Sequence, residues 1–129
     1  MKKILIIEDE IAYLKLLHEQ LALKGFMVID AKDGVDGLEK IKRENPDLVL
    51  LDIRMPKMDG LTMLDLLRKE ESGKTIKVIF LTNLEADEKI LKKVVEDLPL
   101  YYFLKSDTEL DKLISKIEDI LAGGKKREV

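Results

Sequence analysis

Short apolar runs alternate along the chain with longer stretches in which apolar residues recur every three or four positions. A run of about four apolar residues suits a strand, and the longer spacing is typical of a helix with one buried face. The runs show no alternation with polar residues, which favours strands buried on both faces, as in a parallel sheet covered by helices. The predicted strands are 4–7, 26–29, 48–51, 78–81 and 101–104, each followed by a predicted helix.

Glycine and proline help to place the ends of these helices. Gly25 stands where a glycine commonly closes a helix, Pro46 must follow the end of the second helix, and the third helix is expected to end near Gly73. The helical positions with a matching apolar period are Ile11, Leu14, Leu17 and Leu21; Val35, Leu38 and Ile41; Leu61, Leu64 and Leu67; Ile90, Leu91, Val94 and Val95; and Leu110, Leu113, Ile114, Ile117 and Leu121.

The five strand–helix pairs predict an α/β doubly wound fold, with one parallel sheet between two layers of helices. The 129 residues suit a single domain, which we expect to occupy residues 1–122, with a frayed C-terminal tail at 123–129. We find no internal repeat and no linker between domains.

Composition excludes several classes of function. The net charge of −3 argues against nucleic-acid binding through bulk positive charge, and the absence of cysteine excludes disulfides, thiolate metal sites and a cysteine nucleophile. The first apolar run ends at Glu8, so we expect neither a signal sequence nor a membrane span. The expected location is the cytoplasm.

Polar side chains directly follow four of the five predicted strands, at the edge of a parallel sheet where ligands bind. Three neighbouring carboxylates repel one another unless a cation screens them, and Mg²⁺ takes carboxylates together with water and phosphate oxygens. A hydroxyl and an ammonium beside them suit a phosphoryl group, carried either by a ligand or by the protein itself. These strand-end residues are Glu8, Asp9, Asp52, Thr82 and Lys105.

Four segments of the chain resemble the receiver domain of two-component response regulators, in order and in spacing. They are Ile-Leu-Ile-Ile-Glu-Asp-Glu at 4–10, Pro-Asp-Leu-Val-Leu-Leu-Asp-Ile-Arg-Met-Pro-Lys-Met-Asp-Gly at 46–60, Leu-Thr at 81–82 and Tyr-Phe-Leu-Lys at 102–105. The segment at 46–60 is the most diagnostic. The resemblance implies a flavodoxin-like three-layer sandwich with five helices and the strand order 2-1-3-4-5.

The resemblance also implies an acceptor and a metal site. Asp52 would take a phosphoryl group from a histidine kinase or a histidine phosphotransfer protein and form an aspartyl phosphate. Asp9 and Asp52 would bind Mg²⁺ directly, Glu8 would reach it through water, and the backbone carbonyl of Arg54 would add a ligand. Mn²⁺ is a possible substitute for Mg²⁺.

Three further roles come with the resemblance. Lys105 would pair with one phosphoryl oxygen and Thr82 would hydrogen-bond another, so that both act with Asp52 as catalytic residues. Tyr102 matches the switch aromatic, which turns inward when Thr82 moves. The chain departs from the family at Ser106, where proline is usual, so the Lys105–Ser106 peptide bond is open to either cis or trans.

Three functions follow as hypotheses. The leading one is a stand-alone receiver, not an enzyme beyond its own phosphorylation and dephosphorylation, that binds a downstream protein through the face formed by the fourth helix, fifth strand and fifth helix. The second is a degenerate receiver that binds proteins without phosphorylation. The third is a small Mg²⁺-dependent phosphohydrolase, which would need an aspartate where Arg54 stands. Direct binding to nucleic acid or to a membrane is not expected.

Overall fold

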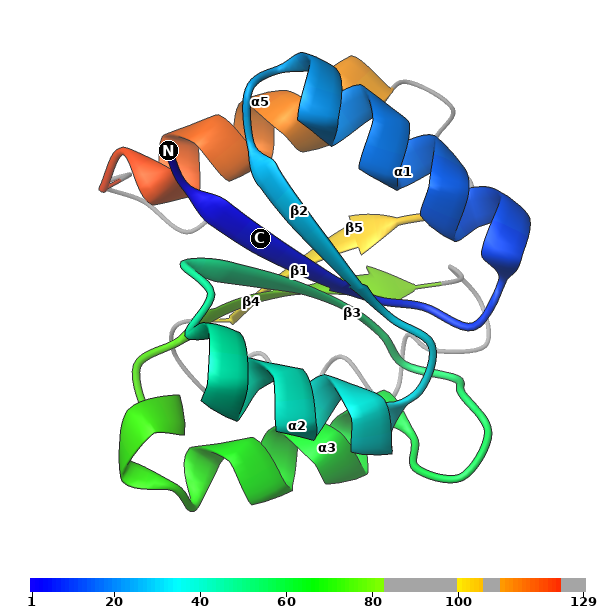
Figure 1. Ribbon diagram of the computed structural model, residues 1–129, viewed down its shortest axis with the longest axis vertical. Helices are drawn as coiled ribbons and strands as arrows, with labels where there is room; N and C mark the ends of the chain where they lie inside the picture. Colours follow the sequence, from blue (N-terminus) through cyan, green and yellow to red (C-terminus); the bar gives the residue numbers. More distant parts are fainter. Residues whose placement is uncertain (83–99, 106–109, 124–129) are drawn as a thin grey trace.

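Five parallel strands form one sheet in the order β2-β1-β3-β4-β5 (Figure 1), which confirms the predicted fold and strand order. The structure is a computed structural model that describes residues 1–82, 100–105 and 110–123. The strands are β1 (Lys3–Ile7), β2 (Met27–Ala31), β3 (Leu48–Asp52), β4 (Lys77–Thr82) and β5 (Leu100–Leu104); the described helices are α1 (Ile11–Leu23), α2 (Gly34–Glu44), α3 (Gly60–Arg68) and α5 (Leu110–Leu121), with a short 3₁₀ turn at Glu71–Gly73. The helix expected around Ile90–Val95 lies outside the described residues.

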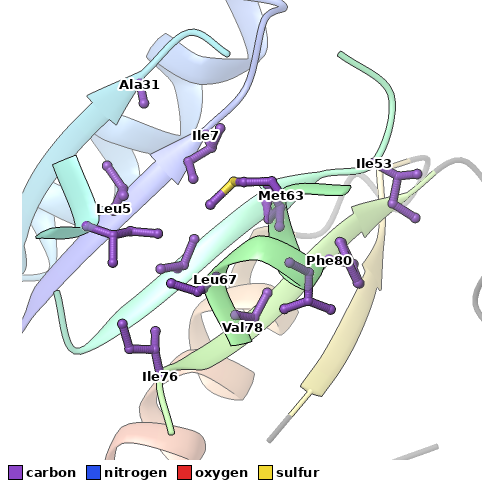
Figure 2. Packing of buried hydrophobic residues seen from close by; sticks show 13 residues of the cluster. Leu5, Ile7, Ala31, Ile53, Met63, Leu67, Ile76, Val78 and Phe80 are labelled. Carbon is purple, nitrogen blue, oxygen red and sulfur yellow. The ribbon is translucent and has the colours of Figure 1, made fainter. Parts of the chain in front are cut away.

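Helices α1 and α5 cover one face of the sheet, and α2 and α3 cover the other (Figure 1). Successive residues of β1 therefore contribute to different cores: Ile4 and Ile6 pack toward α1 and α5, whereas Leu5 and Ile7 pack toward α2 and α3. All four are fully buried, which explains why the strand is apolar without alternation. Figure 2 shows the second of these cores, where Met63 and Leu67 of α3 meet residues of the sheet.

The ends of the elements differ from the sequence prediction in two places. The second strand runs from Met27 to Ala31 rather than from 26 to 29, because the Phe26 amide donates to the Leu21 carbonyl and so completes the end of α1. The third helix ends at Arg68 rather than near Gly73. The Arg68 guanidinium donates to the Gly73 carbonyl at 2.7 Å, and this contact stabilises a separate 3₁₀ turn.

Two residues predicted on buried helical faces are exposed instead. Ile11 is 65% exposed and Val35 is 50% exposed. In α1 the inward stripe passes through Leu17 and Leu21 and reaches the first turn at Tyr13 and Leu14 rather than at Ile11. In α2 the buried stripe is formed by Gly34, Gly37 and Ile41. A prediction from apolar side chains cannot detect the two glycines, because glycine has no side chain. Within the described residues, no helix has the length and apolar character needed to cross a membrane.

Candidate functional site

Three carboxylates meet at the carboxyl ends of the neighbouring strands β1 and β3. Glu8 and Asp9 directly follow β1, and Asp52 is the last residue of β3. One carboxylate oxygen from each lies within 4.8 Å of the others. Glu8 and Asp52 are buried, whereas Asp9 is exposed. The structure therefore brings together the carboxylates that strand-end reasoning predicted as neighbours.

Lys105 extends into this cluster from the end of β5. Its amide donates to the Thr82 carbonyl at 2.8 Å, so the chain stays aligned with β4 up to this residue. Lys105 Nζ lies 2.8 Å from Glu8 Oε1 and 3.6 Å from Asp52 Oδ2, and the side chain is only 8% exposed. Burial lowers the pKa of Lys105, but contacts with Glu8 and Glu10 outweigh burial and raise the pKa above its ordinary value. The ammonium is thus charged across the physiological range.

Asp52 has an environment that opposes its ionisation. Burial is the largest cause, followed by the charge of Glu8, and together they raise the pKa of Asp52 from 3.8 to about 8, although Lys105 acts in the opposite direction. Nearby like charge and desolvation both favour the neutral form of a carboxyl group. A cation bound among these carboxylates would favour the ionised form, which is also the nucleophilic one.

The donor set fits a hard divalent cation. Glu8 Oε1 is buried, and the ammonium of Lys105 lies 2.8 Å from it. Glu8 Oε2 accepts the Glu10 amide at 2.9 Å. Three carboxylate oxygens gathered this closely match the oxygen ligands that Mg²⁺ prefers. Arg54 is exposed and stands two residues after Asp52; the role of its carbonyl stays a prediction.

The loop after Asp52 is fixed against the backbone of that residue. Asp59 caps α3 by accepting the Thr62 amide at 2.8 Å, and the Gly60 amide donates to the Ile53 carbonyl at 2.7 Å. A Cβ atom on Gly60 would collide with the Asp52 carbonyl oxygen. Glycine at this position therefore lets α3 begin directly against the strand that carries Asp52.

Thr82 and Tyr102 lie on the neighbouring strands. Thr82 is fully buried at the end of β4, one residue beyond Leu81, the residue paired with Asp52. Tyr102 pairs with Phe80 in the middle of the β4–β5 ladder, and its partly buried ring lies 5.8 Å from Lys116 Nζ on α5. Their switch roles stay predictions, and Ser106 lies outside the described residues.

Sequence reasoning missed two residues around Lys105. Glu10 Oε1 accepts a hydrogen bond from Lys105 Nζ at 2.9 Å, and the ring centroid of Tyr13 lies 5.0 Å from the same atom. The Tyr13 hydroxyl is buried without a hydrogen-bond partner among the described residues, and burial raises its pKa to about 12. The available signal was the third carboxylate of the run at 8–10 and the three-residue spacing of Glu10 and Tyr13, which places them on one side of a helix start.

Comparisons with known proteins agree with this geometry. The chain is 34% identical over 122 residues to the chemotaxis protein CheY of Treponema pallidum, an alignment that covers 92% of this chain and 82% of that protein. It is 34% identical to the response regulator protein TrrA of Thermotoga maritima, with a TM-score of 0.80 and coverage of 93% of this chain and 99% of the other; TrrA was solved in complex with Mg²⁺ and beryllium fluoride.

Longer regulators match over part of their length. The chain is 43% identical over 83 residues to the probable transcriptional regulator ycf27 of Porphyridium aerugineum, which covers 64% of this chain and 33% of that protein. The chain thus spans about a third of the length of such relatives. The family model of the response regulator receiver domain matches residues 4–118. The chain therefore belongs to the response regulator receiver domain family, whose members serve phosphorylation-dependent signalling.

Proposed function

We propose that Asp52 accepts a phosphoryl group from a histidine kinase or a histidine phosphotransfer protein, and that phosphorylation changes the affinity of this chain for another protein. The observation that carries the proposal is the buried Asp52, with the carboxylates of Glu8 and Asp9 and the ammonium of Lys105 beside it. A nucleophile, a cation site and a fixed positive charge are the parts that phosphoryl transfer requires.

In the proposed transfer, a carboxylate oxygen of Asp52 attacks the phosphorus of a phosphohistidine. The new bond joins that oxygen to phosphorus, the bond from phosphorus to the imidazole nitrogen breaks, and the imidazole keeps the electron pair. Lys105 pairs with one phosphoryl oxygen, and the Thr82 hydroxyl donates a hydrogen bond to another. The buried position of Asp52 limits the access of water to the aspartyl phosphate.

The residues that would hold Mg²⁺ are Asp9 and Asp52 as direct ligands, Glu8 through water, and the backbone carbonyl of Arg54. Bound there, Mg²⁺ would neutralise the carboxylates and the phosphoryl oxygens. We place the binding site for the downstream protein on the surface that includes β5 and α5. Tyr102 would turn inward when Thr82 moves and so change that surface. We also propose that the protein works in the cytoplasm.

Incubation with acetyl phosphate and Mg²⁺, followed by intact-mass measurement, tests this function. The wild-type chain should gain the mass of one phosphoryl group, and the gain should be lost in Asp52→Asn and on chelation of the metal. Asp47→Asn is a matched control, because it makes the same change to an exposed carboxylate just before the same strand. An unlabelled wild type would indicate a degenerate receiver, and continuous release of inorganic phosphate at catalytic rates would indicate a phosphohydrolase.

A further inference from the structure

The Lys105 ammonium is shared by two carboxylates of very different exposure. Glu8 Oε1, 2.8 Å away, belongs to a fully buried side chain, whereas Glu10 Oε1, 2.9 Å away, belongs to one that is 66% exposed. Asp52 Oδ2 is more distant, at 3.6 Å. The two short contacts therefore hold the ammonium where the carboxylate of Asp52 is the farthest of its three acidic partners.

Glu10 stands apart from the cluster of three carboxylates that suits a metal ion, which consists of Glu8, Asp9 and Asp52. It precedes α1 at the N-cap position, yet its side chain makes no capping hydrogen bond and reaches Lys105 instead. A cation bound by the three carboxylates would neutralise the charge of Glu8. Glu10 would then remain as the acidic partner of Lys105. The centroid of the Tyr13 ring lies 5.0 Å from Lys105 Nζ, so the ring borders the ammonium on the side of α1.

We propose that Glu10 is the resting-state counter-ion of Lys105 and that a phosphoryl group on Asp52 displaces it. The inference rests on the proposed function of Asp52. An exposed carboxylate is a weak partner for an ammonium because water screens the pair. A phosphoryl oxygen on the buried Asp52 forms a stronger charge-assisted hydrogen bond, so replacement of Glu10 by this oxygen favours the phosphorylated state. No covalent bond changes at Lys105 or at Glu10.

The exchange makes Glu10 a positioning residue that acts through Lys105 and slows phosphorylation. Before the transfer, Lys105 must loosen its contact with Glu10 to approach the incoming phosphoryl group. The Tyr13 ring remains beside the ammonium throughout, since the attraction of a cation to an aromatic face does not depend on the acidic partner. Removal of the Glu10 charge should therefore release Lys105 and speed the transfer about threefold, within the range expected for an exposed ion pair.

The test is a double-mutant cycle between Glu10 and Lys105. The rate of phosphorylation by acetyl phosphate at saturating Mg²⁺ is measured by intact mass for the wild type, Glu10→Gln, Lys105→Met and the double variant. Glu19→Gln is the matched control, because it removes the same charge from an exposed position of α1 about 13 Å farther along the helix. Glu10→Gln should be about threefold faster than the wild type. Glu19→Gln should match the wild type, and the gain should vanish in the Lys105→Met background.

Each other outcome contradicts the proposal that a phosphoryl group displaces Glu10 from Lys105. A rate for Glu10→Gln that equals or falls below that of Glu19→Gln would show that Glu10 does not restrain Lys105. A gain that persists in Lys105→Met would show that Glu10 acts on the phosphodonor through its charge alone. A wild type that takes no phosphoryl group contradicts the proposed function and the exchange together, whereas a labelled wild type with either of the first two results contradicts the exchange alone.

Discussion

At the amino end of the sheet, charged side chains pair with backbone groups near the surface, whereas at the carboxyl end they are buried against one another. Asp47, just before β3, accepts the Lys3 amide at 2.7 Å, and Lys77 at the start of β4 donates to the Ile120 carbonyl at 3.0 Å. At the other end, Glu8 and Asp52 are 0% and 4% exposed and repel each other, and Lys105 Nζ lies 2.8 Å from Glu8 and 3.6 Å from Asp52.

The difference cannot come from the core, because the same strands reach both ends. β1 begins at Lys3 and leads directly into Glu8, and its four apolar residues in between are fully buried. The amino end pairs polar groups in ways that favour the folded state. The carboxyl end retains a repulsion between carboxylates that Lys105 offsets in part and that a bound cation would relieve further. Perturbed ionisation of this kind is typical of functional sites and lowers stability.

Mg²⁺ should produce the largest change, because it relieves the repulsion at the carboxyl end. At about one hundred times its dissociation constant, a ligand specific for the folded state raises the free energy of unfolding by about 2.7 kcal/mol. Urea denaturation with and without Mg²⁺ measures this difference. Asp9→Ala should remove most of it, and Glu8→Ala should remove less.

Asp47→Ala is the control for the metal effect, since its carboxylate lies at the amino end. It should leave the Mg²⁺ increment unchanged. Equal losses in Asp9→Ala and Glu8→Ala would contradict the division into a direct ligand and a ligand through water.

Asp52→Asn should stabilise the metal-free protein by about 1–2 kcal/mol, because it removes a carboxyl group that must take up a proton on folding at neutral pH and keeps the shape of the side chain. Urea denaturation at neutral pH measures the change. Asp47→Asn, at the exposed amino end, should not stabilise the protein. A loss of stability in Asp52→Asn would show that the contact with Lys105 outweighs the repulsion from Glu8.

The metal-free protein should also lose stability as the pH rises. Asp52 has a pKa of about 8 in the folded state, against an ordinary value of 3.8. Between these two values the folded state binds more protons than the unfolded state, so a rise in pH favours unfolding. Urea midpoints measured across this range should fall more steeply for the wild type than for Asp52→Asn. Parallel profiles would contradict the raised pKa.

The sequence predicts β1, β3 and β4 well because their apolar residues are buried on both faces, so that each of these runs is unambiguous. Strand β2 is mostly only partly buried, and its predicted bounds differ from those of the structure. Helical faces are harder to predict, since a glycine such as Gly37 marks a buried position without any apolar side chain. Ile11 is apolar yet exposed, because Tyr13 and Leu14 already occupy the inward stripe of α1. Periodicity records side-chain chemistry, whereas burial depends on how closely two backbones approach.

The candidate site could be predicted to the extent that strand ends define it. Glu8, Asp52 and Lys105 converge because parallel strands end at one edge of the sheet. The contact of Lys105 with Glu10 joins residues 95 positions apart and depends on side-chain conformation, which a linear pattern does not contain. The raised pKa of Asp52 depends in the same way on three-dimensional burial.

Asp47→Ala should produce the smallest change, because the group it removes is already near solvent. Its carboxylate accepts the Lys3 amide in an exposed hydrogen bond, and loss of such a bond costs about 0.5–1 kcal/mol. Urea denaturation of the metal-free protein should show this loss, while the rate of phosphorylation by acetyl phosphate stays that of the wild type. The change in the free energy of unfolding would then have opposite signs at the two ends of the sheet. Removal of a carboxylate at the amino end lowers stability, and Asp52→Asn at the carboxyl end raises it. A change in phosphorylation rate in Asp47→Ala would show that the two ends are coupled through β3.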